Sequence, residues 1–121
     1  MKTHKDLDVW KLAIGFTTDI YRATESFPRS ELYGLVSQLR RAAVSIASNI
    51  AEGAARQTTK ELIQFLYHSL GSISEVETQL IVSHNLQYLA DEIYEALVNK
   101  QSQISRMLIN LIRSLRRKID R

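Results

Sequence analysis

Apolar residues recur every three to four positions along most of this chain, the spacing that places them on one side of an α-helix. Short polar or turn-forming stretches interrupt the pattern, and neither an apolar–polar alternation nor an Asn-Gly turn indicates a strand or hairpin. The period predicts helices over about 7–25, 30–55, 59–84 and 91–118. Because the connections are only a few residues long, consecutive helices should run antiparallel. We therefore expect residues 1–121 to form one all-α domain, an up-down-up-down four-helix bundle.

Local signals mark the predicted helix ends. Pro28 ends the first helix, because proline disfavours the α conformation in the residue before it. Thr58 and Thr59 carry hydroxyl groups that can cap the third helix, and Glu61 lies in its first turn. The fourth helix starts at Asp91, whose carboxylate suits the positive end of the helix dipole.

Composition restricts the class of protein. Of the 121 residues, 45% are hydrophobic, enough for a real core, and one Pro and four Gly leave little material for turns. The chain has no Cys, which excludes disulfide and thiolate chemistry and suits a reducing compartment. Its first residues, MKTHKDLDVWK, are too charged for a secretory signal, and no apolar run reaches the roughly 18 residues of a membrane span. These features predict a soluble, cytoplasmic protein with no membrane partner.

The second predicted helix has three distinct faces when its residues are placed at 100° steps. Its core stripe contains Leu35, Leu39, Ala42, Ala43, Ile46, Ile50 and Gly53. Its polar face contains Arg41, Ser45, Ser48, Glu52 and Arg56. Between them runs a second apolar seam of Val44, Ala47, Ala51 and Ala55, with Arg40 at its end. A four-helix bundle that stays monomeric buries only the core stripe, so it has no use for a second apolar seam.

The first helix also carries two apolar stripes. We assign the core to the stripe that contains Leu7, Trp10, Ile14, Thr17, Tyr21 and Thr24. Beside it lies a stripe of Val9, Ala13, Phe16 and Ile20. An apolar arc of this breadth indicates burial on two sides, so we predict that this stripe and the seam of the second helix contact another subunit. The alternative is that the alanines merely supply helix propensity.

Two polar residues lie at the edge of the predicted core, Asn49 in the second helix and Glu77 in the third. A half-buried carboxylate needs hydrogen-bond donors or a cation, which Arg40, Arg41 or Asn49 would supply. We interpret Asn49, Glu52 and Glu77 as structural polar residues that set the packing register, not as a catalytic site.

The sequence predicts no enzyme, cofactor or metal site. A di-iron bundle would need Glu-x-x-His pairs, and no Asp or Glu stands three residues before His4, His68 or His84. Phosphate-binding glycine loops and nucleophile elbows are missing from the sequence as well.

The net charge of +3 is unevenly distributed. Residues 106–121 contain Arg106, Arg113, Arg116, Arg117, Lys118 and Arg121 against Asp120 alone, a local charge of +5, so the rest of the chain sums to −2. Around the fourth helix, Arg106, Arg113 and Arg117 fall within about 40° of one another. They lie opposite an apolar stripe of Ile93, Leu97, Ile104, Leu108, Leu111 and Leu115.

These three arginines are the main candidates for contacts with nucleic-acid phosphates, and Gln103 and Asn110 flank them. The further candidates are Arg116, Lys118, Arg40, Arg41 and Arg56. No aromatic residue interleaves with the arginines, so the predicted ligand is structured RNA or DNA, recognised by shape and charge. Two alternatives stay open: the arginines bind an acidic protein partner, or they simply favour the C-terminus of a helix.

Several segments carry a resemblance to a known family. They are DLDVWKLA (6–13), FPRSELYGLVSQLRRAAVSIASNIAEGAAR (27–56), ELIQFLYHSLGSISEVETQL (61–80) and the Leu-x-Tyr-Leu of 86–89. Together they closely resemble the four-helix-bundle family named for 23S rRNA intervening sequences, over nearly the whole chain. Ala47 departs from the family pattern, which usually has Pro there, so the second helix is less kinked than the pattern implies.

The resemblance implies an antiparallel four-helix bundle that assembles into a homopentameric, barrel-like ring. It also implies kinship with accessory proteins of retroelements, which bind nucleic acid and a reverse transcriptase. No catalytic residue is carried over, because the family has no agreed active site. The expected function is a non-enzymatic, oligomeric accessory protein that binds nucleic acid through its basic face. The alternative is an oligomeric protein–protein scaffold that binds no nucleic acid.

Overall fold

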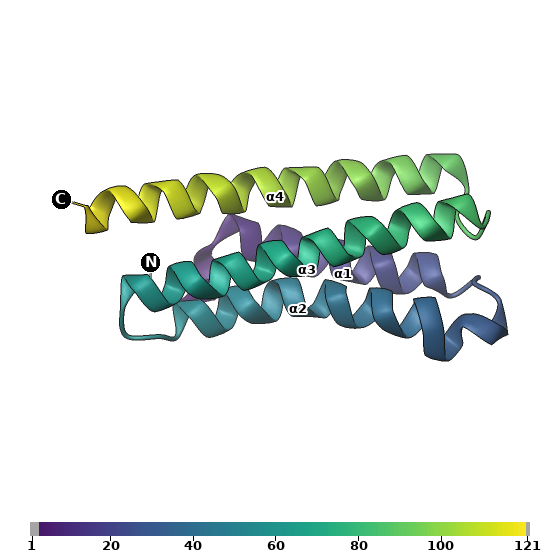
Figure 1. The fold of residues 1–121 in the computed structure, drawn as a ribbon, viewed down its shortest axis with the longest axis horizontal. Coiled ribbons are helices and arrows are strands. Elements are labelled where there is room, and N and C mark those ends of the chain that lie inside the picture. Colours follow the sequence, from purple (N-terminus) through teal and green to yellow (C-terminus); the bar gives the residue numbers. More distant parts are fainter. Residues whose placement is uncertain (1–2, 121) are drawn as a thin grey trace.

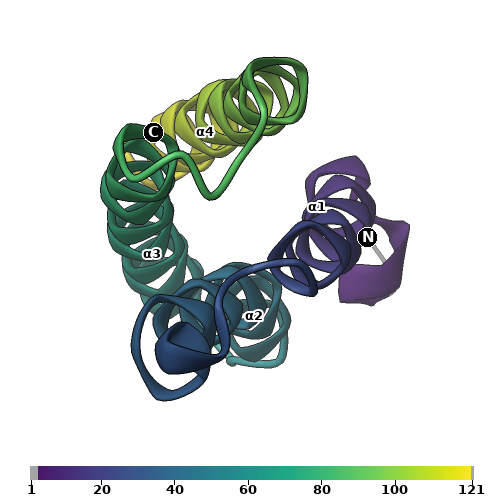
Figure 2. The same ribbon diagram turned by 90° about the vertical axis from the view of Figure 1, so that its right-hand side faces the viewer.

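The computed structural model describes residues 3–120 and is all-α over that stretch. Its α-helices are α1 (Asp8–Thr24), α2 (Ser37–Ala54), α3 (Thr59–Asn85) and α4 (Asp91–Ile119). Short helical turns precede α1 and α2, namely η1 (His4–Asp6), η2 (Arg29–Glu31) and η3 (Leu32–Val36). The chain reverses its direction at each connection between α-helices (Figure 1), and the four helices follow one another around the bundle (Figure 2). The predicted all-α, four-helix fold is confirmed.

Hydrogen bonds at the ends of α3 explain its bounds. The Glu61 amide donates to Thr58 Oγ1 at 3.2 Å, and that hydroxyl donates to the Glu61 carboxylate at 2.9 Å, so the predicted cap is present. At the other end, Gln87 adopts a φ of 64°. The Tyr88 amide donates to the Ser83 carbonyl at 2.9 Å, which completes a Schellman motif. This motif turns the chain toward α4.

The second predicted helix begins later than expected. Continuous helix starts at Ser37, whereas the sequence predicted a start near Ser30. The interruption is at Gly34, whose φ and ψ of −111° lie outside the helical region. A Cβ on Gly34 would lie 2.8 Å from Glu31 Oε1, so this bend leaves no room for a larger residue unless Glu31 moves.

The bent segment is anchored to the connection between α3 and α4. The Tyr88 hydroxyl donates to Glu31 Oε2 at 3.2 Å, and the Tyr88 ring lies 5.4 Å from the ring of Phe27. Partial burial raises the pKa of Tyr88 above its usual value, and the hydrogen bond to Glu31 and its negative charge add to the effect. The phenol therefore keeps its proton into alkaline solution and continues to donate to Glu31.

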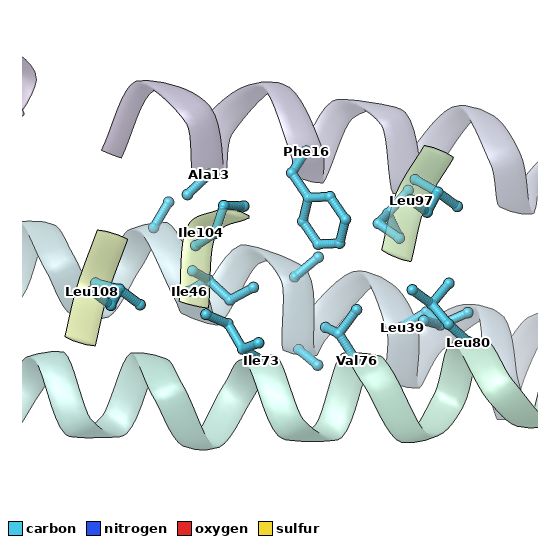
Figure 3. Close-up of a cluster of buried hydrophobic side chains, with 14 of the residues drawn as sticks. Ala13, Phe16, Leu39, Ile46, Ile73, Val76, Leu80, Leu97, Ile104 and Leu108 are labelled. Carbon is cyan, nitrogen blue, oxygen red and sulfur yellow. The ribbon is translucent and has the colours of Figure 1, made fainter. Parts of the chain in front are cut away.

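The core lies along the axis between the four helices (Figure 3). Its largest fully buried apolar side chains are Phe16, Ile20, Leu39, Ile46, Ile50, Leu66, Val76, Leu80, Ile104 and Leu108. The core stripe predicted for the second helix is confirmed, because Leu39 to Gly53 of that stripe are buried and Leu35 is partly buried.

Small residues bring α2 and α3 close together. A Cβ added to Gly53 would lie 2.8 Å from the Phe65 Cβ, so only glycine fits at this crossing. Nearer the middle of the bundle, the buried Ser69 hydroxyl donates to the Ile46 carbonyl at 2.8 Å. These close contacts within one subunit account for the small residues Gly53 of α2 and Ser69 of α3.

The assignment of the two stripes on the first helix was wrong. Val9, Ala13, Phe16 and Ile20, predicted to contact another subunit, are buried inside the bundle, and Phe16 and Ile20 are 0% exposed. Ala47 of the second helix is also buried. The two stripes of α1 adjoin each other and both are apolar, so periodicity does not determine which one faces the core. The structure leaves Ile14 and Tyr21 of the predicted core stripe exposed instead.

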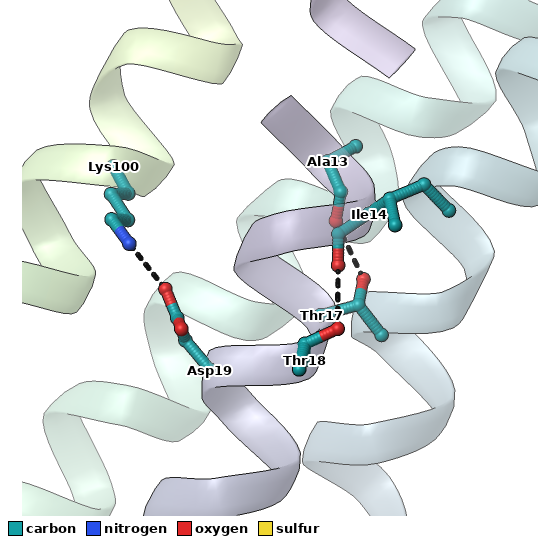
Figure 4. Close-up of polar contacts among 6 residues, drawn as sticks. All are labelled: Ala13, Ile14, Thr17, Thr18, Asp19 and Lys100. Carbon is teal, nitrogen blue, oxygen red and sulfur yellow. Dashed lines mark hydrogen bonds and ion pairs between the residues drawn. The ribbon is translucent and has the colours of Figure 1, made fainter. Parts of the chain in front are cut away.

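Polar contacts hold α1 to both of its neighbours, and Figure 4 shows the one with α4. The Lys100 ammonium of α4 forms an ion pair with the Asp19 carboxylate of α1. On the other side, the Thr17 hydroxyl is 2.8 Å from the Ala13 carbonyl of its own helix and 3.1 Å from the Ala43 carbonyl of α2. These contacts fix the rotation of α1 that buries Phe16.

Candidate nucleic-acid interface and subunit surface

The outer face of α4 carries the basic line, defined as Arg106, Arg113 and Arg117. All three side chains are exposed, and in the described part of the chain none makes an ion pair or a side-chain hydrogen bond. At 1.5 Å per residue, the arginines are spaced by about 10 Å and then about 6 Å along the helix. Gln103 and Asn110 are exposed on the same face, as predicted. The basic line can therefore meet an extended polyanion without first breaking an internal contact.

Burial of the opposite side of α4 orients this face toward solvent. Leu97, Ile104 and Leu108 of the predicted stripe are buried, and Ile112, which was not in that stripe, is buried as well. Ile93 of the predicted stripe is 47% exposed. Because the core holds one side of α4 along most of its length, the basic line points away from the bundle.

Arg116 belongs to a different face from the basic line. Its guanidinium lies 5.3 Å from the centre of the Tyr67 ring of α3, an arrangement that a cation–π attraction favours. Together with Lys60, Ile63, Ile119 and Asp120 it lines a cavity of about 310 Å³. Sequence reasoning missed Lys60, although its place in the first turn of α3 puts it near the end of α4. Lys118 is exposed, and Arg121 lies outside the described residues.

Arg40 and Arg41 of α2, and Arg56 just after it, lie away from the basic line. The reason is that α2 and α4 occupy diagonally opposite positions in the bundle (Figure 2). Arg40 is occupied within the bundle: its Nε donates to Thr24 Oγ1 at 3.0 Å, and its guanidinium lies 4.6 Å from the centre of the Tyr21 ring. Arg56 pairs with Glu52 at 2.7 Å. Arg41 is exposed and lines a polar cavity of about 430 Å³ between α2 and α3.

The structural polar residues have different environments. Asn49 is half-buried, and its Nδ2 donates to the Ser45 carbonyl at 2.8 Å and to the Ser45 hydroxyl at 2.9 Å. Glu77 is exposed and contacts none of the donors proposed for it. The prediction of a half-buried Glu77 was wrong. The preceding residue, Val76, occupies the core position, so Glu77 lies about 100° further around the helix, on the exposed side.

The histidines are spread over separate parts of the bundle. The His84 ring stacks on Tyr94 with 4.0 Å between ring centres, and its Nε2 lies 2.7 Å from Asp91 Oδ1. His68 is exposed on α3, and His4 packs edge-on against Trp10. Among the side chains that the structure describes, no three His, Asp or Glu gather closely enough to hold a metal ion. No helix within residues 3–120 is long and apolar enough to cross a membrane.

Exposed apolar residues remain on the outer sides of both α1 and α2. We call this set the α1–α2 face and define it by Ile14, Tyr21, Val44, Ala51 and Ala55. Ile14, Tyr21 and Val44 are each 40–42% exposed, Ala55 is exposed, and Ala51 is partly buried. Of the seam predicted on the second helix, Val44, Ala51 and Ala55 thus remain on the surface. On α1 the exposed apolar residues are Ile14 and Tyr21, which belong to the stripe assigned to the core and not to the stripe predicted to contact another subunit.

The geometry defines an all-α bundle with an exposed basic line on α4 and an apolar face on α1 and α2. A family model for the 23S rRNA-intervening sequence protein matches residues 5–110, and the chain belongs to this family. A solved structure of a protein of unknown function from the S23 ribosomal protein family of Bacteroides thetaiotaomicron has the same fold. It is 24% identical, with a TM-score of 0.80, and the match covers 87% of this chain and 95% of that one. Among curated proteins, no sequence matches this chain.

Proposed function

We propose that this protein is a non-enzymatic, cytoplasmic accessory protein that binds structured RNA or DNA through the basic line of α4. The observation that carries the proposal is the set of Arg106, Arg113 and Arg117, which are exposed on one face and make no ion pair with another described residue. Such a face contacts phosphates without first breaking an ion pair between described residues, and its affinity depends on salt because binding releases counterions.

The proposal includes assembly into a homopentameric ring of antiparallel bundles. The apolar α1–α2 face supports assembly, because a monomer gains nothing from exposing Ile14, Tyr21 and Val44 together. In a ring, each subunit presents its own basic line, so phosphate contacts repeat around the assembly. A reverse transcriptase is a proposed protein partner by kinship with the retroelement accessory proteins.

A specific observation favours a second function, that of a protein-binding scaffold. Tyr33 in η3 is 93% exposed and adjoins the exposed Leu32. Aromatic side chains that protrude from a surface are common anchors of protein interfaces. In this alternative the arginines of α4 would meet an acidic protein instead of a nucleic acid.

Binding to nucleic acid distinguishes the two functions. Fluorescence anisotropy of labelled structured RNA and duplex DNA, titrated with wild-type protein over a salt series, should show binding that weakens steadily as salt rises. Light scattering on the same samples reports whether the protein is assembled. If an assembled protein does not bind either nucleic acid at low salt, the scaffold function is the correct one.

A further inference from the structure

The polar cavity of about 430 Å³ noted beside Arg41 lies between α2 and α3, which run side by side (Figures 1 and 2). We call it the α2–α3 cavity. Its lining includes Arg41, Ser45, Ser72, Glu75 and Gln79. The volume is in the range of small-molecule sites, which occur between the helices of bundles. Neither the basic line nor the α1–α2 face contains any of these five residues, so the cavity is separate from both surfaces.

The two serine hydroxyls in the wall of the cavity have no proton left to donate. Ser72 Oγ donates to the His68 carbonyl at 3.2 Å and lies 2.8 Å from Ser45 Oγ. Because a hydroxyl has one proton and that of Ser72 is already used, Ser45 is the donor between the two serines. Ser45 Oγ also accepts from Asn49 Nδ2 at 2.9 Å. Each serine oxygen therefore keeps one free lone pair, and this wall favours a ligand that donates hydrogen bonds.

Gln79 and Glu75 add further acceptors to the same cavity. Gln79 Oε1 is buried and receives no hydrogen bond from a described residue, which leaves a desolvation cost until a donor is supplied. Rotation of the Gln79 amide about its last side-chain bond turns this oxygen toward a ligand in the cavity. Glu75 is exposed and makes no ion pair with another described residue. A primary ammonium, with three protons and a positive charge, matches this set of oxygen acceptors.

Arg41 brings the opposite charge to the cavity. Its side chain is exposed and makes no ion pair with Glu75 or with any other described residue. A guanidinium recognises a carboxylate through paired, charge-assisted hydrogen bonds. A second cavity, of about 500 Å³, shares Glu75 and Gln79 with the first and adds the apolar side chains of Leu35 and Val82. One ligand would therefore meet an anion, a cation and an apolar wall.

We propose that the α2–α3 cavity binds a free aliphatic α-amino acid. The ammonium of the ligand donates to Glu75 and to the serine oxygens, and its carboxylate meets Arg41. Its side chain extends along Leu35 and Val82. A zwitterion fits better than an ion of one sign, because Arg41 repels a simple cation and Glu75 repels a simple carboxylate. The inference does not depend on nucleic-acid binding, since α4 contributes no residue to either cavity.

Ligands that lack one of the two charges test this assignment. Isothermal titration calorimetry of the wild-type protein with L-leucine should show saturable binding of one ligand per chain. N-acetyl-L-leucine lacks the ammonium, and L-leucinamide lacks the carboxylate. Each should bind at least about tenfold more weakly than L-leucine, because each loses charge-assisted hydrogen bonds at one end of the cavity.

Matched variants of the protein assign each end of the ligand to its residue. Glu75→Gln should bind L-leucine about tenfold more weakly, and acetylating the ligand should then cost little more, because the partner of the ammonium is already lost. Arg41→Gln should behave in the same way toward L-leucinamide. Both residues are exposed, so helix content and the midpoint of unfolding should not change. Glu95→Gln, exposed on α4, is the control and should bind L-leucine as wild type does.

Three results would overturn the inference. The first is a wild-type protein that shows no saturable binding of L-leucine at millimolar concentrations. The second is binding that Glu75→Gln and Arg41→Gln leave unchanged, which places the amino acid elsewhere on the protein. The third is L-leucinamide binding as tightly as L-leucine, which makes the cavity a site for simple cations with no part for Arg41. None of these results bears on the anisotropy titrations with nucleic acid, so the two proposals fail separately.

Discussion

Replacing Phe16 by alanine is expected to lower the free energy of unfolding by about 3–5 kcal/mol, the usual cost of deleting a large buried aromatic side chain. Phe16 is fully buried and points into the space between the helices (Figure 3). Its neighbours in the bundle are held by helices on several sides, so they cannot close the cavity that the substitution leaves. Chemical denaturation monitored by circular dichroism measures the change.

Ile14→Ala is the matched control, because Ile14 lies two positions away on the neighbouring stripe of α1 and is 42% exposed. Its expected cost is under about 1 kcal/mol in a single subunit, since 42% of the residue's surface is already in water. If Ile14 lies in a subunit contact, its cost will grow with protein concentration, whereas that of Phe16 will not. An equal and concentration-independent cost for the two substitutions would show that the assignment of the α1 stripes is wrong.

Replacing Arg106, Arg113 and Arg117 together by glutamine is expected to weaken nucleic-acid binding by about a hundredfold or more at low salt, because three charge-assisted phosphate contacts are lost. The slope of log affinity against log salt should fall by about 1 for each phosphate contact removed. All three side chains are exposed and make no ion pair with another described residue, so the substitutions should leave folding and assembly intact. Anisotropy titrations and light scattering measure both properties.

The control variant removes the same number of charges elsewhere. Lys5, Lys11 and Arg29 are exposed, lie outside α4, and make no ion pair in the described part of the chain. Changing them together to glutamine lowers the net charge by the same amount as the α4 variant does. It should reduce affinity only slightly, through the general field of the protein. If both variants lose affinity equally, binding follows net charge and the basic line has no special role.

Local signals were enough to predict much of the fold. Thr58 and Glu61 mark the start of α3. In α2, the polar residues on one side of the helix show that the apolar stripe on the opposite side faces the core. The first helix has no such contrast, because Phe16 and Ile14 belong to adjoining apolar stripes. Only the contacts of α1 with α2 and α4, such as the ion pair of Asp19 and Lys100, determine its rotation. Such contacts join residues far apart in the sequence, so periodicity does not reveal them.

The candidate site was predictable where it depends on a single helix. The spacing of Arg106, Arg113 and Arg117 places them on one side of α4, and burial of the other side exposes them. Arg40 shows the limit of this reasoning. Its charge is visible in the sequence, but its partners Thr24 and Tyr21 belong to another helix, and they convert it into a structural contact.

Photo-crosslinking with peptide mapping tests most directly whether nucleic acid binds to α4. Wild-type protein is irradiated with a structured RNA that carries 4-thiouridine, and the cross-linked peptides are identified by mass spectrometry. Binding through the basic line predicts cross-links between Gln103 and Arg117, with few on the α1–α2 face. Cross-links confined to α1, α2 or η3, or none above those of an unrelated protein of similar charge, would contradict a nucleic-acid interface on α4.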